Sequence, residues 1–171
     1  CTYNGDHMSM YAVNTSIPKT LVRTLVYEIG HYMDENGFAG MKTVIEDIIN
    51  TPVSPELLPP NADGTIAQKT EETVGSYILH DFFLYYTLRY GMAPAEIMAL
   101  CKEAVRQNDE YKFSDKEIQK WLNVFYKRFF QQQFKRNCMP DGVKVGSVSV
   151  SPRGDLRLPA EIESEEFTEY E

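Results

Sequence analysis

The sequence lacks the signals of several large protein classes. It contains no run of about 18 apolar residues, so no segment has the composition of a membrane-spanning helix. Its three cysteines, Cys1, Cys101 and Cys138, show neither C-x-x-C spacing nor a pairing pattern. This usage predicts a reducing, cytoplasmic setting and argues against a zinc site. The three histidines are widely scattered and give no metal-binding pattern either.

Short catalytic motifs are also missing. There is no Walker-type or dinucleotide-type phosphate loop and no G-x-S-x-G nucleophile turn. The spacing of the residues predicts no catalytic Cys/His pair and no catalytic pair of carboxylates. A formal net charge of −8 and a pI near 4.9 argue against general binding of nucleic acid. The chain starts with CTYNGDH in place of Met or a signal peptide, so we expect a piece of a longer protein.

What is present is typical of a globular, mainly helical domain. Apolar residues make up 43% of 171 residues, enough for one sizeable core. Apolar positions at helical spacing predict five helices, over residues 17–33, 41–50, 77–90, 95–105 and 115–134. We expect Ser16 to cap the first helix with Pro18 in its first turn, and Ser114 with Glu117 to form a capping box before the last.

The third predicted helix, YILHDFFLYYTLRY, is the most hydrophobic segment. Its apolar residues predict a buried face, formed by Leu79, Phe82, Phe83, Tyr86 and Tyr90. Gly91 is the expected C-terminal cap of this helix. Cys101 on the next helix is predicted to face the core and to be inert.

The organisation predicted for the chain is a helical domain over residues 1–158 and an acidic, solvated tail over 159–171. Residues 51–76 form a long, Pro-rich loop, which is either a flexible linker or a functional, mobile segment containing Ser54. Residues 131–158 form a loop that we call the cationic segment. Between Lys127 and Arg157 there are seven Lys/Arg and two Asp, a local net charge of about +5 in an acidic chain.

The cationic segment predicts either an anionic ligand or a cover formed by the acidic tail. Lys135 and Arg136 are the best anchors, because lysine offers a point charge and arginine a two-pronged donor for phosphate or carboxylate. Lys144 and Arg153 are second choices. On the first helix, Lys19 is part of either a solvated face or a phosphate contact at the helix start.

Longer motifs resemble a known family. The stretches YNGDHMSMYAVNTSIPKTLVR, SPELLPP with QKTEETVGSYILHDFFLYY, and KRFFQQQFKRNCMPDGVKVGSVSVSPRGD are similar to the C-terminal part of glutamine-dependent NAD+ synthetases. The resemblance covers nearly the whole chain, from Cys1 to about Pro159. It implies that this helical chain is the last part of a Rossmann-like α/β domain of the adenine nucleotide α-hydrolase kind. The parent would also have an N-terminal glutaminase domain.

The resemblance also implies a reaction and its partners. ATP, with Mg2+, adenylates the carboxylate of deamido-NAD (nicotinic acid adenine dinucleotide), and ammonia derived from glutamine attacks the acyl adenylate to form NAD+. Such ligases form large homo-oligomers. The family's ATP phosphate loop and glutaminase residues are not in this sequence, so we expect the chain alone to be inactive. The alternative is a helical phosphate-binding or interaction module without catalysis.

Residue roles are implied by the same resemblance. Lys19 of IPKT matches an ATP-phosphate lysine, and Ser54 of SPELL matches a hydroxyl near ATP in a loop that orders on binding. Lys135 of FKR matches a lysine that contacts deamido-NAD. The chain departs from ammonia-dependent relatives at Phe134 and Met10, where those have His and Asp. No catalytic or metal-ligating residue is assigned, and the possible supporting residues are Asp6, Arg136, Lys144 and Arg153.

Overall fold

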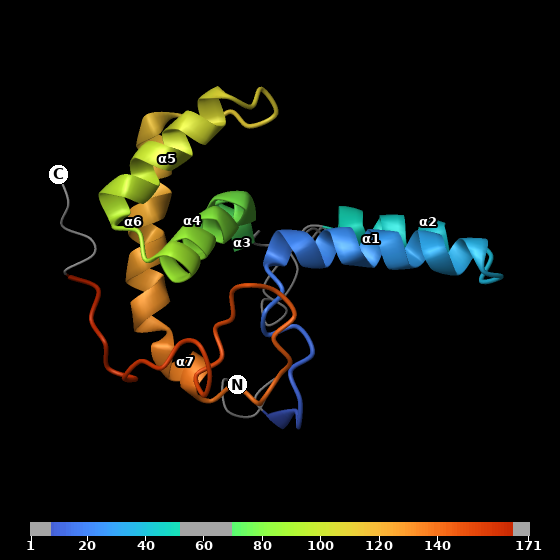
Figure 1. Ribbon diagram of the computed structural model, residues 1–171. Helices are drawn as coiled ribbons and strands as arrows, with labels where there is room; N and C mark the ends of the chain where they lie inside the picture. Colours follow the sequence, from blue (N-terminus) through green and yellow to red (C-terminus); the bar gives the residue numbers. More distant parts are fainter. Residues whose placement is uncertain (1–7, 52–69, 166–171) are drawn as a thin grey trace, which may run out of the picture. The chain divides into compact units, whose positions relative to one another are not determined.

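A computed structural model of the chain describes residues 8–51 and 70–165 (Figure 1). The chain divides into two compact units. One, the hairpin unit, is Pro18–Tyr77; the other, the core unit, combines Cys1–Ile17 with Ile78–Glu171. This differs from the single domain expected from length, because nearly all the buried apolar side chains of the described residues belong to the core unit.

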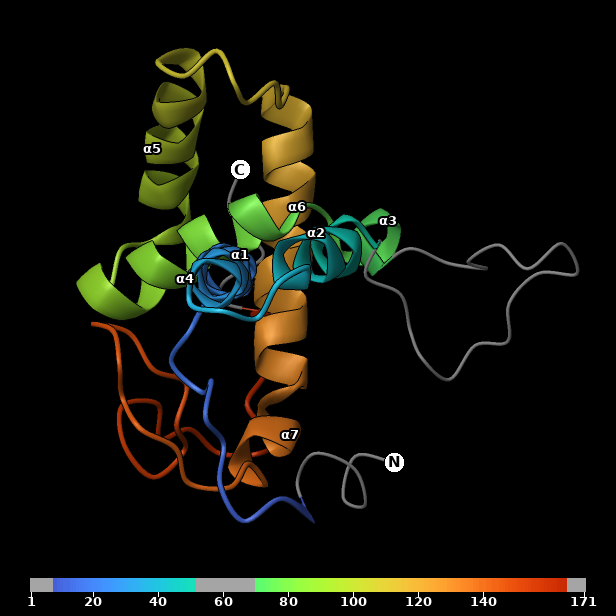
Figure 2. The same cartoon turned by 90° about the vertical axis from the view of Figure 1, so that its right-hand side faces the viewer.

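The hairpin unit is built on two helices that lie side by side, α1 (Lys19–Glu35) and α2 (Met41–Asn50) (Figures 1 and 2). Gly30 permits their close approach, since a Cβ there would lie 2.6 Å from Ile45 Cγ1. The Gly40 N–H, at the N-terminus of α2, donates to Asp34 Oδ1 at 2.8 Å. A carboxylate at a helix N-terminus is favourable because it satisfies a free N–H and faces the positive end of the dipole.

The predicted Ser16 cap of α1 is wrong. Pro18 occupies the N-cap position in an extended conformation, and no side chain caps the helix. Ser16 is unavailable because its hydroxyl is bonded to the backbone of Val143 and Val145 instead. The predicted end of α2 at residue 50 is confirmed. The predicted loop over residues 51–76 is wrong at its C-terminal end, where α3 spans Thr70–Val74.

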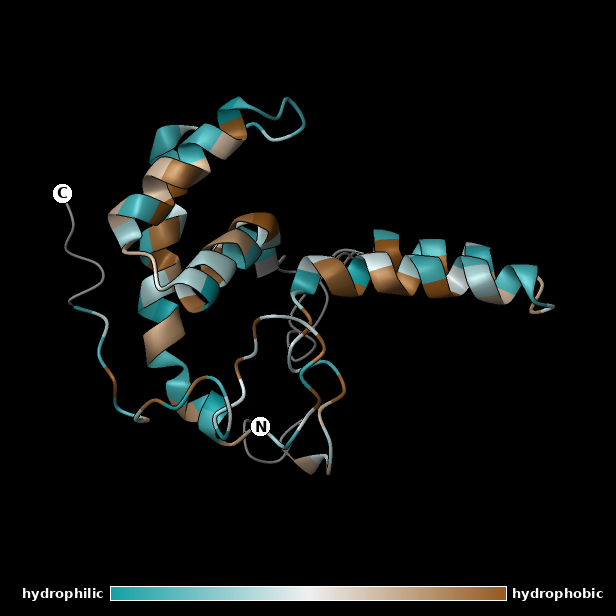
Figure 3. Ribbon diagram, in the orientation of Figure 1, coloured by the Kyte–Doolittle hydropathy of each residue, from teal (hydrophilic) through white to brown (hydrophobic). Residues whose placement is uncertain are grey.

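Apolar residues, brown in Figure 3, are common on α1 and α2, and several of their side chains are exposed. Gly30 is the only buried residue of the helices α1 and α2. Ile29 on α1 and Ile48 on α2 are both more than half exposed. The apolar stripe predicted for the first helix is therefore not buried within this unit.

The core unit contains three longer helices: α4 (Tyr77–Tyr90), α5 (Pro94–Arg106) and α6 (Asp115–Gln131), of which α5 and α6 lie side by side (Figures 1 and 2). Their apolar faces form one core cluster. Its fully buried side chains include Phe83, Ile97, Ile118 and Leu122. The burial predicted for the third helix is confirmed at Leu79 and Phe83 and wrong at Tyr90, which is 61% exposed at the helix end.

Other local predictions in the core unit are confirmed. Ser114 and Glu117 form the capping box of α6, with the Ser114 N–H donating to Glu117 Oε2 at 2.8 Å. Gly91 has a φ of +63° after the last residue of α4, the left-handed conformation that glycine adopts most easily. Cys101 is 2% exposed, and its burial raises the pKa of the thiol to about 11, as an inert core thiol requires.

The last predicted helix is shorter than expected. α6 ends at Gln131, and a separate short helix, α7 (Gln133–Asn137), follows it. The helical pattern breaks at Gln132, whose carbonyl accepts the N–H of Lys135 at 3.1 Å. Lys135 and Arg136 thus lie on a helix, not on the loop predicted from the sequence.

The described residues contain helices and turns but no strand, so the prediction of a mainly helical chain is confirmed for residues 8–51 and 70–165. The predicted acidic tail is described only as far as residue 165. Its Ile162 packs against the core cluster, which differs from a fully solvated tail. None of the helices in the described part of the chain is long and apolar enough to cross a membrane.

Candidate functional site

Arg136, on α7, is half-buried and is held by contacts within the core unit. Its guanidinium donates to Gln133 Oε1 at 2.9 Å and to the Phe129 carbonyl, and its Cζ lies 4.3 Å from the centroid of the Phe129 ring. Burial lowers the pKa of Arg136 to about 10. Because its donors face the C-terminal turn of α6, this cation completes a helix end.

Gln133 extends this arrangement. Its side chain is fully buried, accepts from Arg136, and donates through Nε2 to Asn137 Oδ1 at 2.8 Å. Asn137 in turn donates to the Leu158 carbonyl at 3.4 Å. The chain of side-chain bonds therefore connects α6, α7 and the end of the cationic segment.

Lys135 differs from its neighbour. It is exposed, and its ammonium lies 6.0 Å from the ring centroid of Phe134. Among the described residues, no hydrogen bond or ion pair occupies this ammonium group. A free ammonium beside an apolar ring can approach a phosphate or a carboxylate without first breaking an internal bond.

The other predicted cations are engaged within the cationic segment. Arg153 donates to Asp141 Oδ1 and to the Met139 carbonyl. Lys144 pairs with Asp155, with 2.7 Å between Nζ and Oδ2. The two aspartates of the segment thus face two of its cations, and both pairs bring distant parts of the segment together.

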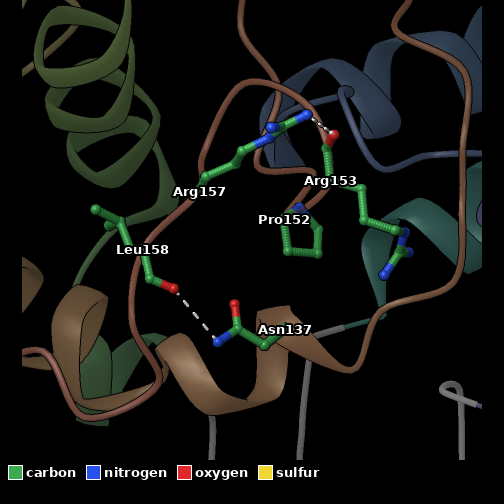
Figure 4. Close-up of a pocket in the computed structure, with 5 residues that line it drawn as sticks. All are labelled: Asn137, Pro152, Arg153, Arg157 and Leu158. Carbon is green, nitrogen blue, oxygen red and sulfur yellow. Dashed lines mark hydrogen bonds between the residues drawn. The ribbon is translucent and has the colours of Figure 1, made fainter.

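A hollow of about 450 Å3 lies beside these residues, lined by Asn137, Pro152, Arg153, Arg157 and Leu158 (Figure 4). Arg157 Nη2 donates to the Arg153 carbonyl at 2.9 Å. The side chain of Arg153 points away from Arg157 (Figure 4).

The hairpin unit contains the predicted ATP residue Lys19. It is the first residue of α1, is exposed, and its ammonium lies 5.8 Å from the ring centroid of Tyr77. A hollow of about 470 Å3 in this unit is lined by α1 and α2 residues that include Arg23 and Glu46. Asp6 and Ser54, the remaining predicted site residues, lie outside the described residues.

The sequence does not predict three polar residues of the core unit as site residues: Ser16, Gln133 and Arg157. Ser16 was assigned to a helix cap, and Gln133 was placed inside a continuous helix. Arg157 was only counted as a charge. A buried glutamine within the QQQ run gives no periodic signal, so only the structure distinguishes Gln133 from its neighbours.

No protein-family model matches the chain. Several curated proteins are similar to the chain. The chain is 35% identical over 173 residues to a protein of Mycobacterium leprae (strain TN) and 36% identical over 174 residues to one of Mycobacterium tuberculosis (strain ATCC 25618 / H37Rv). Each alignment covers 92% of this chain, and both proteins are named glutamine-dependent NAD(+) synthetase. The chain resembles part of a glutamine-dependent NAD(+) synthetase.

The resemblance predicted from the motifs is thereby confirmed. A synthetase of Mycobacterium bovis (strain ATCC BAA-935 / AF2122/97) is likewise 36% identical over 174 residues. The chain spans 25% of the length of these synthetases.

Proposed function

We propose that the chain is part of an NAD+ synthetase that amidates deamido-NAD with ATP and glutamine-derived ammonia. Its similarity to synthetases over 92% of its length supports this proposal most directly. The proposal includes the α/β parent domain, the glutaminase domain, homo-oligomer formation and a cytoplasmic location. As a quarter of such a protein, the chain supplies part of the synthetase site.

The reaction has two steps. A carboxylate oxygen of deamido-NAD attacks the α-phosphorus of ATP, and pyrophosphate leaves. Ammonia then attacks the acyl carbon, AMP leaves, and nitrogen loses a proton to give the amide of NAD+. Negative charge accumulates on phosphate oxygens in the first step, so fixed cations that face these oxygens would lower its barrier.

Lys135 is the residue of the cationic segment that we assign to deamido-NAD. Its ammonium is exposed and free among the described residues, whereas Arg136 and Arg153 donate to internal oxygens. Lys144 already faces Asp155. A role for these three in binding would be indirect, through the shape of the segment. Lys19 and Ser54 are assigned to ATP on their motifs alone.

Mg2+ would neutralise phosphate charge in this reaction. The described residues contain no group of three or more His, Cys, Asp or Glu side chains that could hold a metal ion. The described residues therefore do not supply a full ligand set for the ion.

Steady-state kinetics of Lys135→Ala in the full-length protein test the assignment. We expect the KM for deamido-NAD to rise by about tenfold or more, the usual effect of losing one charge-assisted contact, with little change in the KM for ATP. Gln131→Ala, an exposed position one turn earlier, is the matched control. An unchanged KM and kcat for deamido-NAD would remove Lys135 from the site.

The 171-residue chain alone provides a second arm of this experiment. We expect it to form no NAD+ from ATP and deamido-NAD. If the full-length protein binds the dinucleotide but does not convert it, the chain is part of a phosphate-binding module and the proposed reaction is wrong.

A further inference from the structure

A stretch of the chain before α1 is fastened to the cationic segment. The Ser16 hydroxyl donates to the Val143 carbonyl at 3.1 Å and accepts the Val145 N–H at 2.7 Å. Nearby, the Ala12 N–H donates to the Asp141 carbonyl at 2.8 Å. We call this set of contacts between residues 12–16 and 141–146 the clasp. It joins two stretches separated by more than 120 positions in the sequence.

Gly142 is where the two stretches come closest. A Cβ at this position would lie 2.5 Å from Thr15 Oγ1 and closer still to the Ala12 carbonyl oxygen. Backbone cannot move away as a flexible side-chain end can. The glycine of the PDG motif is therefore required by the clasp.

Apolar burial does not account for the position of residues 143–145. The side chains of Val143 and Val145 are 53% and 67% exposed, whereas Ser16 is only 8% exposed. A loop that buries little apolar surface depends on its polar bonds for a fixed position. The Ser16 hydroxyl uses both its donor and its acceptor capacity for this purpose.

The clasp continues toward α7, which carries Lys135. Asp141, whose carbonyl is held by Ala12, accepts a bond from Arg153 through its carboxylate. Arg153 also donates to the Met139 carbonyl, and the Met139 N–H donates to the Arg136 carbonyl at 3.0 Å. An unbroken path of bonds thus connects residue 12 to the helix turn that bears Lys135.

We propose that Ser16 is a positioning residue: its hydroxyl fixes residues 143–145, which continue the backbone from Asp141, and Asp141 with Arg153 in turn fixes the orientation of the Lys135 turn toward an anionic substrate. This role rests on the proposed function for the identity of the substrate. The clasp itself does not depend on that identity, so the two can be tested separately.

The test compares Ser16→Ala and Ser16→Thr in the full-length protein, because threonine keeps the hydroxyl. Amide hydrogen exchange of residues 141–147 measures the clasp. We expect exchange at these residues to become about tenfold faster in Ser16→Ala, since two hydrogen bonds are lost, and to return toward wild type in Ser16→Thr. Exchange in α6 stays unchanged. Ser147→Ala, an exposed serine of the same segment, is the control.

Kinetics measure the positioning role. We expect the KM for deamido-NAD to rise at least threefold in Ser16→Ala, with the KM for ATP unchanged and partial rescue by Ser16→Thr. Gly142→Ala attacks the clasp from the opposite stretch, and it is expected to give the same pattern if Ser16→Ala folds poorly.

Each other outcome contradicts a defined part of the proposal. Unchanged exchange at residues 141–147 overturns the clasp. Faster exchange with an unchanged KM for deamido-NAD overturns the positioning role. A wild-type protein that makes no NAD+ overturns the proposed function and the substrate named here, while the exchange measurement still decides the clasp.

Discussion

Replacing Arg136 by alanine should destabilise the chain, whereas replacing Lys135, the adjacent cation of the same motif, should not. The guanidinium of Arg136 bonds the Phe129 carbonyl and Gln133 Oε1, and it stacks on the Phe129 ring. The neighbouring ammonium makes no hydrogen bond or ion pair among the described residues. The pair therefore separates a structural cation from a free one.

The expected loss follows from these contacts. Hydrogen bonds from a charged donor contribute about 1.5–3 kcal/mol each, and a guanidinium over an aromatic ring adds about 0.5–1 kcal/mol. Desolvation of the charge, which also lowers the pKa of Arg136, opposes these terms. We expect a net loss of about 2 kcal/mol in the free energy of unfolding for Arg136→Ala, and about 1 kcal/mol for Arg136→Lys, which cannot reach both acceptors at once.

Urea unfolding of the chain, followed by the fluorescence of its single tryptophan, Trp121 on α6, measures this difference. Lys135→Ala is the matched control and should change the free energy of unfolding by less than about 0.5 kcal/mol. If Arg136→Ala and Lys135→Ala give the same stability, Arg136 does not complete the end of α6, and its assignment as a structural cation is wrong.

Three further predictions concern helix starts. Lys19→Ala in the full-length protein should raise the KM for ATP by about tenfold while leaving that for deamido-NAD unchanged, because Lys19 is an exposed cation at the first position of α1; equal ATP kinetics would place it on a merely solvated face. Ser114→Ala should reduce the free energy of unfolding by about 1 kcal/mol through loss of the α6 cap, with a shift in the urea midpoint as the measurement. Hydrogen bonds from the backbone and hydroxyl of Ser114 lower the pKa of Glu117. The stability that the Glu117 carboxylate contributes is therefore present above the ordinary Glu pKa and is lost as pH falls through the lowered pKa. Unfolding midpoints across acidic pH should thus fall less in Ser114→Ala than in the wild type, and parallel curves would contradict the coupling.

Local sequence rules determined much of the helical framework. Apolar spacing located the helices of the core unit, and the Ser114 capping box and Gly91 fixed two of their ends. These features depend on contacts within a few residues, which a single sequence contains in full. The family resemblance was likewise readable from contiguous motifs, and the curated relatives confirm it.

Two errors occurred where a tertiary contact overrides a local preference. Ser16 has the chemistry and position of a helix cap, yet residues 143–145 use its hydroxyl. The basic run at residues 135–136 reads as one cationic patch, yet one side chain packs inward on Phe129 and the other stays in solvent. The sequence by itself determined the helices, the charge of the segment and the family likeness. Only the tertiary structure decided that Ser16 bonds residues 143–145, because hydrogen bonds between stretches more than 120 residues apart leave no local pattern. It also decided which cations are already bonded, because the direction of each side chain depends on how the chain turns around it.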